Sequence, residues 1–66
     1  MINIDLIEQL RKQHGYSQLQ MGEFLGYESH TAYGRKIRGT RDFSIDDIVK
    51  LCNLFSLVPN DLIVLN

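Results

Sequence analysis

Start and stop signals for two short helices lie close together between Ser17 and Gly39, and they constrain the fold more than any other feature of this chain. Ser17 is followed three residues later by Gln20, a spacing at which each side chain can hydrogen-bond the other residue's backbone at the start of a helix. Gly26 stands where the left-handed residue that ends such a helix is expected. A second helical segment follows and ends at Gly39. The stretch therefore predicts two helices joined by a tight turn.

The first of these helices has an apolar face. Met21, Phe24 and Leu25 recur at spacings of three and four, which places them on one side of the helix, facing inward. Gly22 lies among them, and a glycine inside a helix costs about 1 kcal/mol relative to alanine. We therefore expect another backbone to approach closely at Gly22. Two helices, a turn containing glycine and a small residue at the crossing point are typical of a helix-turn-helix unit.

The wider sequence resembles the Cro/C1-type (lambda-repressor-like, XRE) helix-turn-helix family. The resemblance is carried by Ser17-Gln18, Gly22, Leu25-Gly26, Arg38-Gly39 and the run SIDDIVKLCNLFSLVPNDLI from Ser44 to Ile63. It covers nearly the whole chain, from about Asp5 to Ile63. It implies an all-α fold in which residues 1–66 form a single compact domain of five helices, with the helix-turn-helix at helices two and three.

The start of the second helix of the motif has two alternatives, because this segment is one residue longer than the common family pattern. If Glu28 caps the helix, Ala32 packs inward. If Ser29 caps it, Tyr33 and Ile37 are four residues apart and form a buried pair. The second alternative gives the larger apolar face, and we favour it.

Positive charge is concentrated at the end of this helix, although the net charge of the chain is −1. Arg35, Lys36, Arg38 and Arg41 are four of the 7 basic residues, and no acidic residue lies among them. Such a run in an arbitrary helical protein is usually a solvated helix end. Beside a predicted recognition helix, a local basic patch indicates contact with phosphates.

The rest of the chain is expected to form a scaffold. A first helix over residues 3–13 should face inward with Leu6, Ile7 and Leu10. Ser44 and Asp47 form a capping pair at the start of the fourth helix. The core stripe of that helix is predicted to be Ile45, Ile48, Val49, Cys52 and Phe55. Pro59 suits the first turn of a fifth helix, NDLIVLN.

Other classes of site find no support in the sequence. His14 and His30 have no Cys or His partner at the spacing of a metal site, and no glycine-rich phosphate loop follows a strand. The chain has no apolar run long enough to span a membrane, and its single cysteine suits a reducing cytosol. We expect a cytoplasmic protein that is not an enzyme, with no metal, cofactor, membrane partner or small-molecule ligand.

The predicted function is sequence-specific binding to double-stranded DNA as a transcriptional regulator, a repressor by resemblance, with residues 29–38 in the major groove. The residues expected to reach base edges are Ser29, His30, Thr31 and Tyr33. The residues expected to hold phosphates are Gln18, Arg35, Lys36, Arg38, Thr40 and Arg41.

Apolar residues near the C-terminus exceed what one core can cover, and such a surface often marks a partner site. We expect a homodimer through the C-terminal helix, with contacts from Leu54, Val58, Ile63, Val64 and Leu65. Its operator would be an inverted repeat with half-sites about 34 Å apart. The alternative is a protein-interaction module, an antitoxin-like or anti-repressor partner, that retains the fold and binds DNA weakly or not at all.

Overall fold

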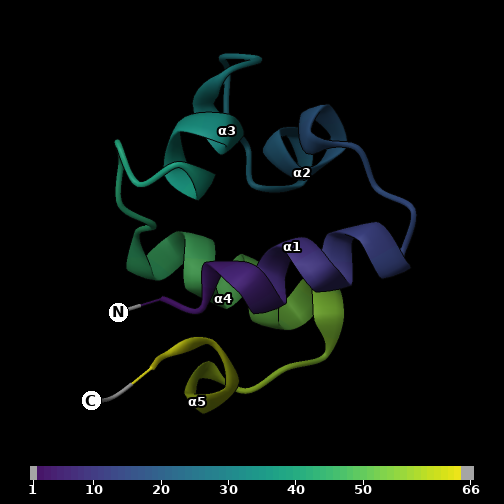
Figure 1. Ribbon diagram of the computed structural model, residues 1–66, viewed down its shortest axis with the longest axis vertical. Coiled ribbons are helices and arrows are strands. Elements are labelled where there is room, and N and C mark those ends of the chain that lie inside the picture. The colour runs from purple at the N-terminus through teal and green to yellow at the C-terminus, as the bar shows by residue number, and fades with distance from the viewer. Residues whose placement is uncertain (1, 65–66) are drawn as a thin grey trace.

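The computed structural model describes residues 2–64 and arranges them as short helices in three tiers (Figure 1). The helices are α1 (Ile4–Gln13), α2 (Gln18–Phe24), α3 (Ala32–Ile37), α4 (Ile45–Phe55) and α5 (Pro59–Leu62). In Figure 1, α2 and α3 lie at one end of the molecule, α1 and α4 cross its middle, and α5 lies at the opposite end. This architecture confirms the predicted all-α, five-helix class.

The predicted helix starts of α2 and α4 are both capping boxes. The Gln20 amide donates to Ser17 Oγ at 3.0 Å, and the Ser17 amide donates to Gln20 Oε1 at 2.8 Å. Ser44 and Asp47 exchange the same two bonds, at 3.1 and 2.9 Å. Gly26 has a φ of +79°, so it ends α2 in the left-handed conformation that its position predicted.

Each helix contributes one fully buried side chain to the core. These five side chains are Ile7, Met21, Tyr33, Leu51 and Leu62. Because every helix places a large side chain at the same centre, the helices support one another, and α3 has a defined position although it is only 6 residues long. The prediction of a buried pair is confirmed in part, since Tyr33 is fully buried and the half-buried Ile37 packs against the same cluster.

The predicted core stripe of α4 is partly wrong. Ile45 is 82% exposed and Val49 is 49% exposed, whereas Leu51 is fully buried. The buried line runs through Asp47, Leu51 and Phe55, at the four-residue spacing of one helix face. The capping residue Asp47 belongs to the inward face, and this turns Ile45 and Val49 outward. Cys52 is a free, buried thiol, as predicted.

Two expectations for α2 also differ from the structure. Phe24 is 45% exposed, and its ring meets the Tyr16 ring edge-on, with 5.0 Å between the ring centroids. At Gly22, an added Cβ would meet its nearest neighbours, which are side-chain carbons of Tyr27 and Tyr33, at 3.9 Å. This is ordinary van der Waals contact, so no backbone approach requires glycine at this position.

The C-terminal helix is shorter than predicted. It ends at Leu62, and Ile63 is extended and forms an antiparallel bridge with Ile2. The Asn3 amide donates to the Leu62 carbonyl oxygen at 2.7 Å. The two ends of the described chain therefore lie side by side, on the side of the molecule away from α2 and α3 (Figure 1).

Candidate nucleic-acid interface

The Glu8 carboxylate on α1 binds a side chain of α3 and fixes the position of that helix. The Tyr33 hydroxyl donates to Glu8 Oε2 at 2.8 Å, across 25 positions of sequence. The Arg11 guanidinium donates to both oxygens of Glu8, at 2.7 and 3.2 Å, and to the Tyr16 carbonyl oxygen at 2.7 Å. The side-chain nitrogen of Gln18, Nε2, lies 3.4 Å from Glu8 Oε1. One acidic side chain therefore connects α1 to both helices of the motif.

The hydrogen bonds that Glu8 accepts keep its carboxylate ionised. Burial alone would raise the pKa of Glu8, but the hydrogen bonds from Arg11, Tyr33 and Gln18 favour the carboxylate and lower the pKa below its ordinary value. The pKa of the Tyr33 hydroxyl is raised, first by burial and then by its bond to Glu8. At neutral pH the hydroxyl is therefore a donor and the carboxylate an acceptor, and both shifts favour their hydrogen bond.

A second carboxylate holds α3 from α4. The Lys36 ammonium pairs with Asp47 Oδ2 and lies 4.5 Å from the centre of the Tyr27 ring and 5.8 Å from that of Phe43. Burial would raise the pKa of Asp47, but the bonds from Lys36 and from the Ser44 amide outweigh it, and the pKa is lowered. An ammonium that is enclosed by a carboxylate and two aromatic faces is held against the protein.

Tyr27 completes this second cluster. Its hydroxyl is buried and, within residues 2–64, forms no hydrogen bond of good geometry. Burial raises the pKa of Tyr27, and the nearby Asp47 carboxylate raises it further. The contact between Tyr27 and Asp47 is therefore electrostatic rather than a well-aligned hydrogen bond.

The turn before α3 differs from both alternatives that the sequence offered. The helix begins at Ala32, and its N-cap Thr31 makes no side-chain capping bond. Neither Glu28 nor Ser29 is the cap. Ser29 instead stabilises the turn, because its Oγ lies 3.0 Å from Thr31 Oγ1 and accepts from the Thr31 amide at 3.3 Å. The turn between α2 and α3 spans residues 25–31.

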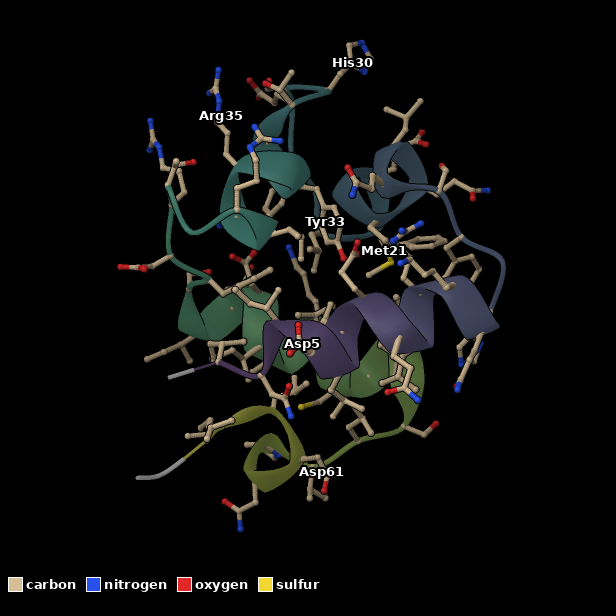
Figure 2. The ribbon with its side chains drawn as sticks, viewed as in Figure 1. Asp5, Met21, His30, Tyr33, Arg35 and Asp61 are labelled. Carbon is tan, nitrogen blue, oxygen red and sulfur yellow. The ribbon has the colours of Figure 1, made fainter. Side chains whose placement is uncertain are left out.

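The end of the molecule formed by this turn and α3 carries exposed polar side chains. Ser29, His30 and Thr31 are exposed, as expected of base contacts. Figure 2 shows His30 and Arg35 directed away from the protein body, whereas Tyr33 points toward Met21 and α1. Of the residues expected to hold phosphates, Gln18, Arg35, Arg38 and Arg41 are exposed.

Three predicted contacts are contradicted by this arrangement. Tyr33 is 1% exposed and its hydroxyl is bonded to Glu8, so it cannot reach a base edge. The Lys36 ammonium pairs with Asp47 and its side chain is only 16% exposed, so it is not available to a phosphate. Both the hydroxyl and the amide of Thr40 donate to the Arg35 carbonyl oxygen, at 2.9 and 3.0 Å. Thr40 therefore closes the end of α3 and has no donor left for a phosphate.

Glycine at position 34 makes room between α2 and the end of α3. A Cβ at Gly34 would lie 3.1 Å from Arg38 Nη1 and 3.6 Å from Gln18 Oε1. The guanidinium and the amide therefore converge over the bare backbone of Gly34. Both were predicted to hold phosphates, and the structure brings them to one place.

Arg35 and Arg41 line a hollow of about 340 Å³ beside the turn. Its remaining lining residues are Tyr27, Glu28, Ser29, Ala32 and Lys36. Among residues 2–64, the cations without an acidic partner are Lys12, Arg35, Arg38 and Arg41. Unpaired positive charge is therefore concentrated around α3 more strongly than the sequence indicates.

The residues expected at a dimer contact lie at the opposite end of the molecule. Val58 is 58% exposed and Ile63 is 36% exposed, at the two ends of α5. Leu54 and Val64 are half-buried. Leu65 lies outside the described residues. Because α5 ends at Leu62, the expected contact through a longer C-terminal helix becomes a contact through one helical turn and an extended segment.

Sequence reasoning missed the two positioning carboxylates, Glu8 and Asp47. For Asp47 the sequence indicates only a capping role, and for Glu8 it indicates no contact with α3. The one local signal was the three-residue spacing of Glu8 and Arg11, which allows an ion pair on a helix. The partners Tyr33 and Lys36 are distant in sequence, and nothing in the sequence pairs them.

Within residues 2–64, no cluster of three or more His, Cys, Asp or Glu side chains could hold a metal ion. No helix there is long and apolar enough to cross a membrane.

Comparisons with curated proteins and with solved structures gave no match. A comparison with protein families gave a match to the helix-turn-helix model over residues 7–59, which is most of the chain. These residues include α2, the turn, α3 and both positioning carboxylates. The chain belongs to the Cro/C1-type helix-turn-helix family of DNA-binding regulators.

Proposed function

We propose that this protein is a cytoplasmic transcriptional repressor that binds a specific sequence of double-stranded DNA through the turn and α3. The observation that carries the proposal is the distribution of unpaired charge. Arg35, Arg38 and Arg41 are exposed and have no acidic partner among the described residues, and all three lie on α3 or just after it. A cationic edge of this kind attracts the DNA backbone although the net charge of the chain is −1.

The residues of the proposed interface have two roles, contact with bases and contact with phosphates. His30 and Thr31 project from the turn and are placed to meet base edges in the major groove. Gln18 and Arg38, which converge over Gly34, and Arg41 in the following loop are placed to hold phosphates on either side. The carboxylates of Glu8 and Asp47 contact no DNA and set the position of α3.

We also propose that the protein binds as a homodimer to an inverted repeat. Each subunit carries a single α3, so one subunit would read one half-site, and the half-sites of a repeat one helical turn apart are separated by about 34 Å. Val58 and Ile63 provide exposed apolar surface on the side away from α3, where a partner would leave the DNA-binding end open.

A salt series on labelled duplex DNA tests the proposal. Affinity for a nonspecific duplex should fall steeply as salt rises, because each phosphate contact releases counterions. Arg41→Gln should reduce the slope of log affinity against log salt concentration by about one counterion. Lys12→Gln is the matched control, since it removes the same charge from α1 and should leave the slope unchanged. Absence of binding at low salt would contradict the proposal.

One observation favours the second candidate, a protein-interaction module. Leu19 is 48% exposed and, with Glu23 and Glu28, lines a hollow of about 270 Å³ on the outer side of α2. Acidic side chains at this place repel phosphates and suit a basic or amphipathic protein partner. The salt series separates the two candidates, because this one predicts no binding to duplex DNA at any salt concentration.

A further inference from the structure

The side chains of α3 leave few candidates for reading a base. Tyr33 and Ile37 face the core, Lys36 is paired with Asp47, and Gly34 has no side chain. Ala32 is half-buried and offers only a methyl group. Within the helix itself, Arg35 is therefore the one exposed side chain that carries hydrogen-bond donors.

The position of Arg35 on the helix gives it a direction. Successive residues of an α-helix are rotated by about 100°. Arg35 is two residues after Tyr33 and two before Ile37, so it lies about 160° from each on opposite sides. It therefore points directly away from the buried pair that fixes the orientation of α3, and Figure 2 shows its side chain directed out of the molecule.

This direction distinguishes Arg35 from the other two exposed arginines. Arg38 lies beside Gly34 and Gln18, on the flank of α3 that faces α2. Arg41 lies beyond the helix, in the loop before α4. When a helix lies in the major groove, the residue opposite its buried face meets the groove floor and the residues on its flanks meet the phosphate ridges.

We propose that Arg35 reads a guanine in each half-site of the operator, a role that rests on the proposed function of DNA binding. The guanidinium fork presents two parallel N–H donors, and guanine presents O6 and N7 acceptors at the matching separation in the major groove. Among residues 2–64, no acid forms an ion pair with Arg35, so the fork is free to meet the base. Arg35 is thus a specificity-determining residue rather than one of the phosphate contacts that the sequence indicates.

The test combines a change in the protein with a change in the base. A site is first selected from a random duplex pool with the wild-type full chain. Each guanine of the consensus is then replaced by 7-deazaguanine, which lacks the N7 acceptor. The wild type should lose roughly 5- to 100-fold in affinity at one guanine of each half-site. Arg35→Ala removes the donors, and should no longer distinguish guanine from 7-deazaguanine there.

Arg41→Ala is the matched control, because Arg41 is also exposed and lies outside the helix. It should keep the full loss of affinity when 7-deazaguanine replaces the same guanine. The proposal is overturned if Arg35→Ala still distinguishes guanine from 7-deazaguanine there, or if Arg35→Ala and Arg41→Ala behave alike. Failure of the proposed function has a different signature, since a wild-type chain that selects no DNA sequence would remove the basis for both. Circular dichroism confirms that each variant is folded.

Discussion

Gly34 is a residue that, we propose, serves binding at the expense of helix stability. In the middle of α3 it costs about 1 kcal/mol relative to alanine. Its backbone conformation is helical and does not require glycine. The space above it is occupied by the ends of Arg38 and Gln18. We infer that this position is glycine because the two DNA-facing side chains need the room.

Replacing Gly34 by alanine should therefore separate stability from binding. The new Cβ would lie 3.1 Å from Arg38 Nη1, and the flexible guanidinium can move aside at little cost. We expect the free energy of unfolding to rise by up to about 1 kcal/mol, while affinity for DNA falls because Arg38 is displaced. Urea denaturation and a binding titration measure the two effects.

Gly22→Ala is the control for this comparison. It adds the same methyl group to α2, where the nearest atoms are at 3.9 Å and belong to Tyr27 and Tyr33. It should stabilise the protein similarly and leave DNA affinity unchanged. If both variants bind DNA as the wild type does, Gly34 has no role in binding.

At the scale of elements, α3 depends on its neighbours more than on itself. The helix has 6 residues, contains Gly34 and has no side-chain cap. Isolated helices of this length are unstable in water. Its position comes from the burial of Tyr33 and from two carboxylates, Glu8 on α1 and Asp47 on α4. The recognition element is therefore stable only when the whole domain is folded.

The two carboxylates predict that acid destabilises the domain. The pKa values of Glu8 and Asp47 are lowered in the folded state, so their contribution to stability is complete above the pKa of the unfolded chain, near 4. It is lost as the pH falls through the lower folded values, because the folded state must then take up protons. Urea midpoints should therefore be constant from about pH 7 to pH 5 and decrease below that range.

Glu8→Gln tests whether the acid sensitivity of the domain comes from the Glu8 carboxylate. The variant should be less stable than the wild type at pH 7, and its stability should depend less on pH below 5. Glu23→Gln, on the exposed face of α2, should follow the wild type. If the stability of Glu8→Gln falls with acid as much as that of the wild type, protonation of Glu8 does not contribute to the acid sensitivity of folding.

The elements that the sequence predicts well are those with local causes. Capping boxes at Ser17 and Ser44 and the left-handed Gly26 depend on residues within four positions, and all three are confirmed. Several of the wrong predictions concern the direction in which a side chain points. Tyr33 satisfies an inward apolar pattern and an outward polar one equally well, and only the position of Glu8 decides between them.

Ion pairs between elements could not be predicted from the sequence. Lys36 belongs to a basic run and lies 11 positions from Asp47, and no local pattern distinguishes it from Arg35 or Arg38. The residue at which α3 starts could not be predicted from the local sequence either, because the extra residue could extend either the helix or the turn. The structure starts the helix at Ala32, after a turn in which Ser29 and Thr31 bond to each other.

At the scale of the whole molecule, the unpaired arginines and the proposed dimer contact lie at opposite ends. The unpaired arginines surround α3, and the exposed Val58 and Ile63 flank α5. A subunit built in this way can bind a partner and DNA at the same time. This separation supports the proposed dimer on an inverted repeat.

We expect Val58→Asp to dissociate the dimer without unfolding the subunit, because the charge would be buried in the contact and not in the core. Sedimentation velocity over a concentration series measures the effect. Ile45→Asp is the matched control, since Ile45 is 82% exposed on α4 and lies outside the proposed contact. A wild-type chain that remains monomeric at high micromolar concentration would contradict the dimer.

The most direct test of the central claim, that the turn and α3 form the DNA-binding surface, is an amide chemical-shift titration of the wild-type protein with duplex DNA. The account predicts that the largest changes occur over residues 28–41 and near Gln18, and that the amides of α5 change only through dimer formation. Changes concentrated on α4 and α5, with residues 28–41 unaffected while DNA binds, would contradict it.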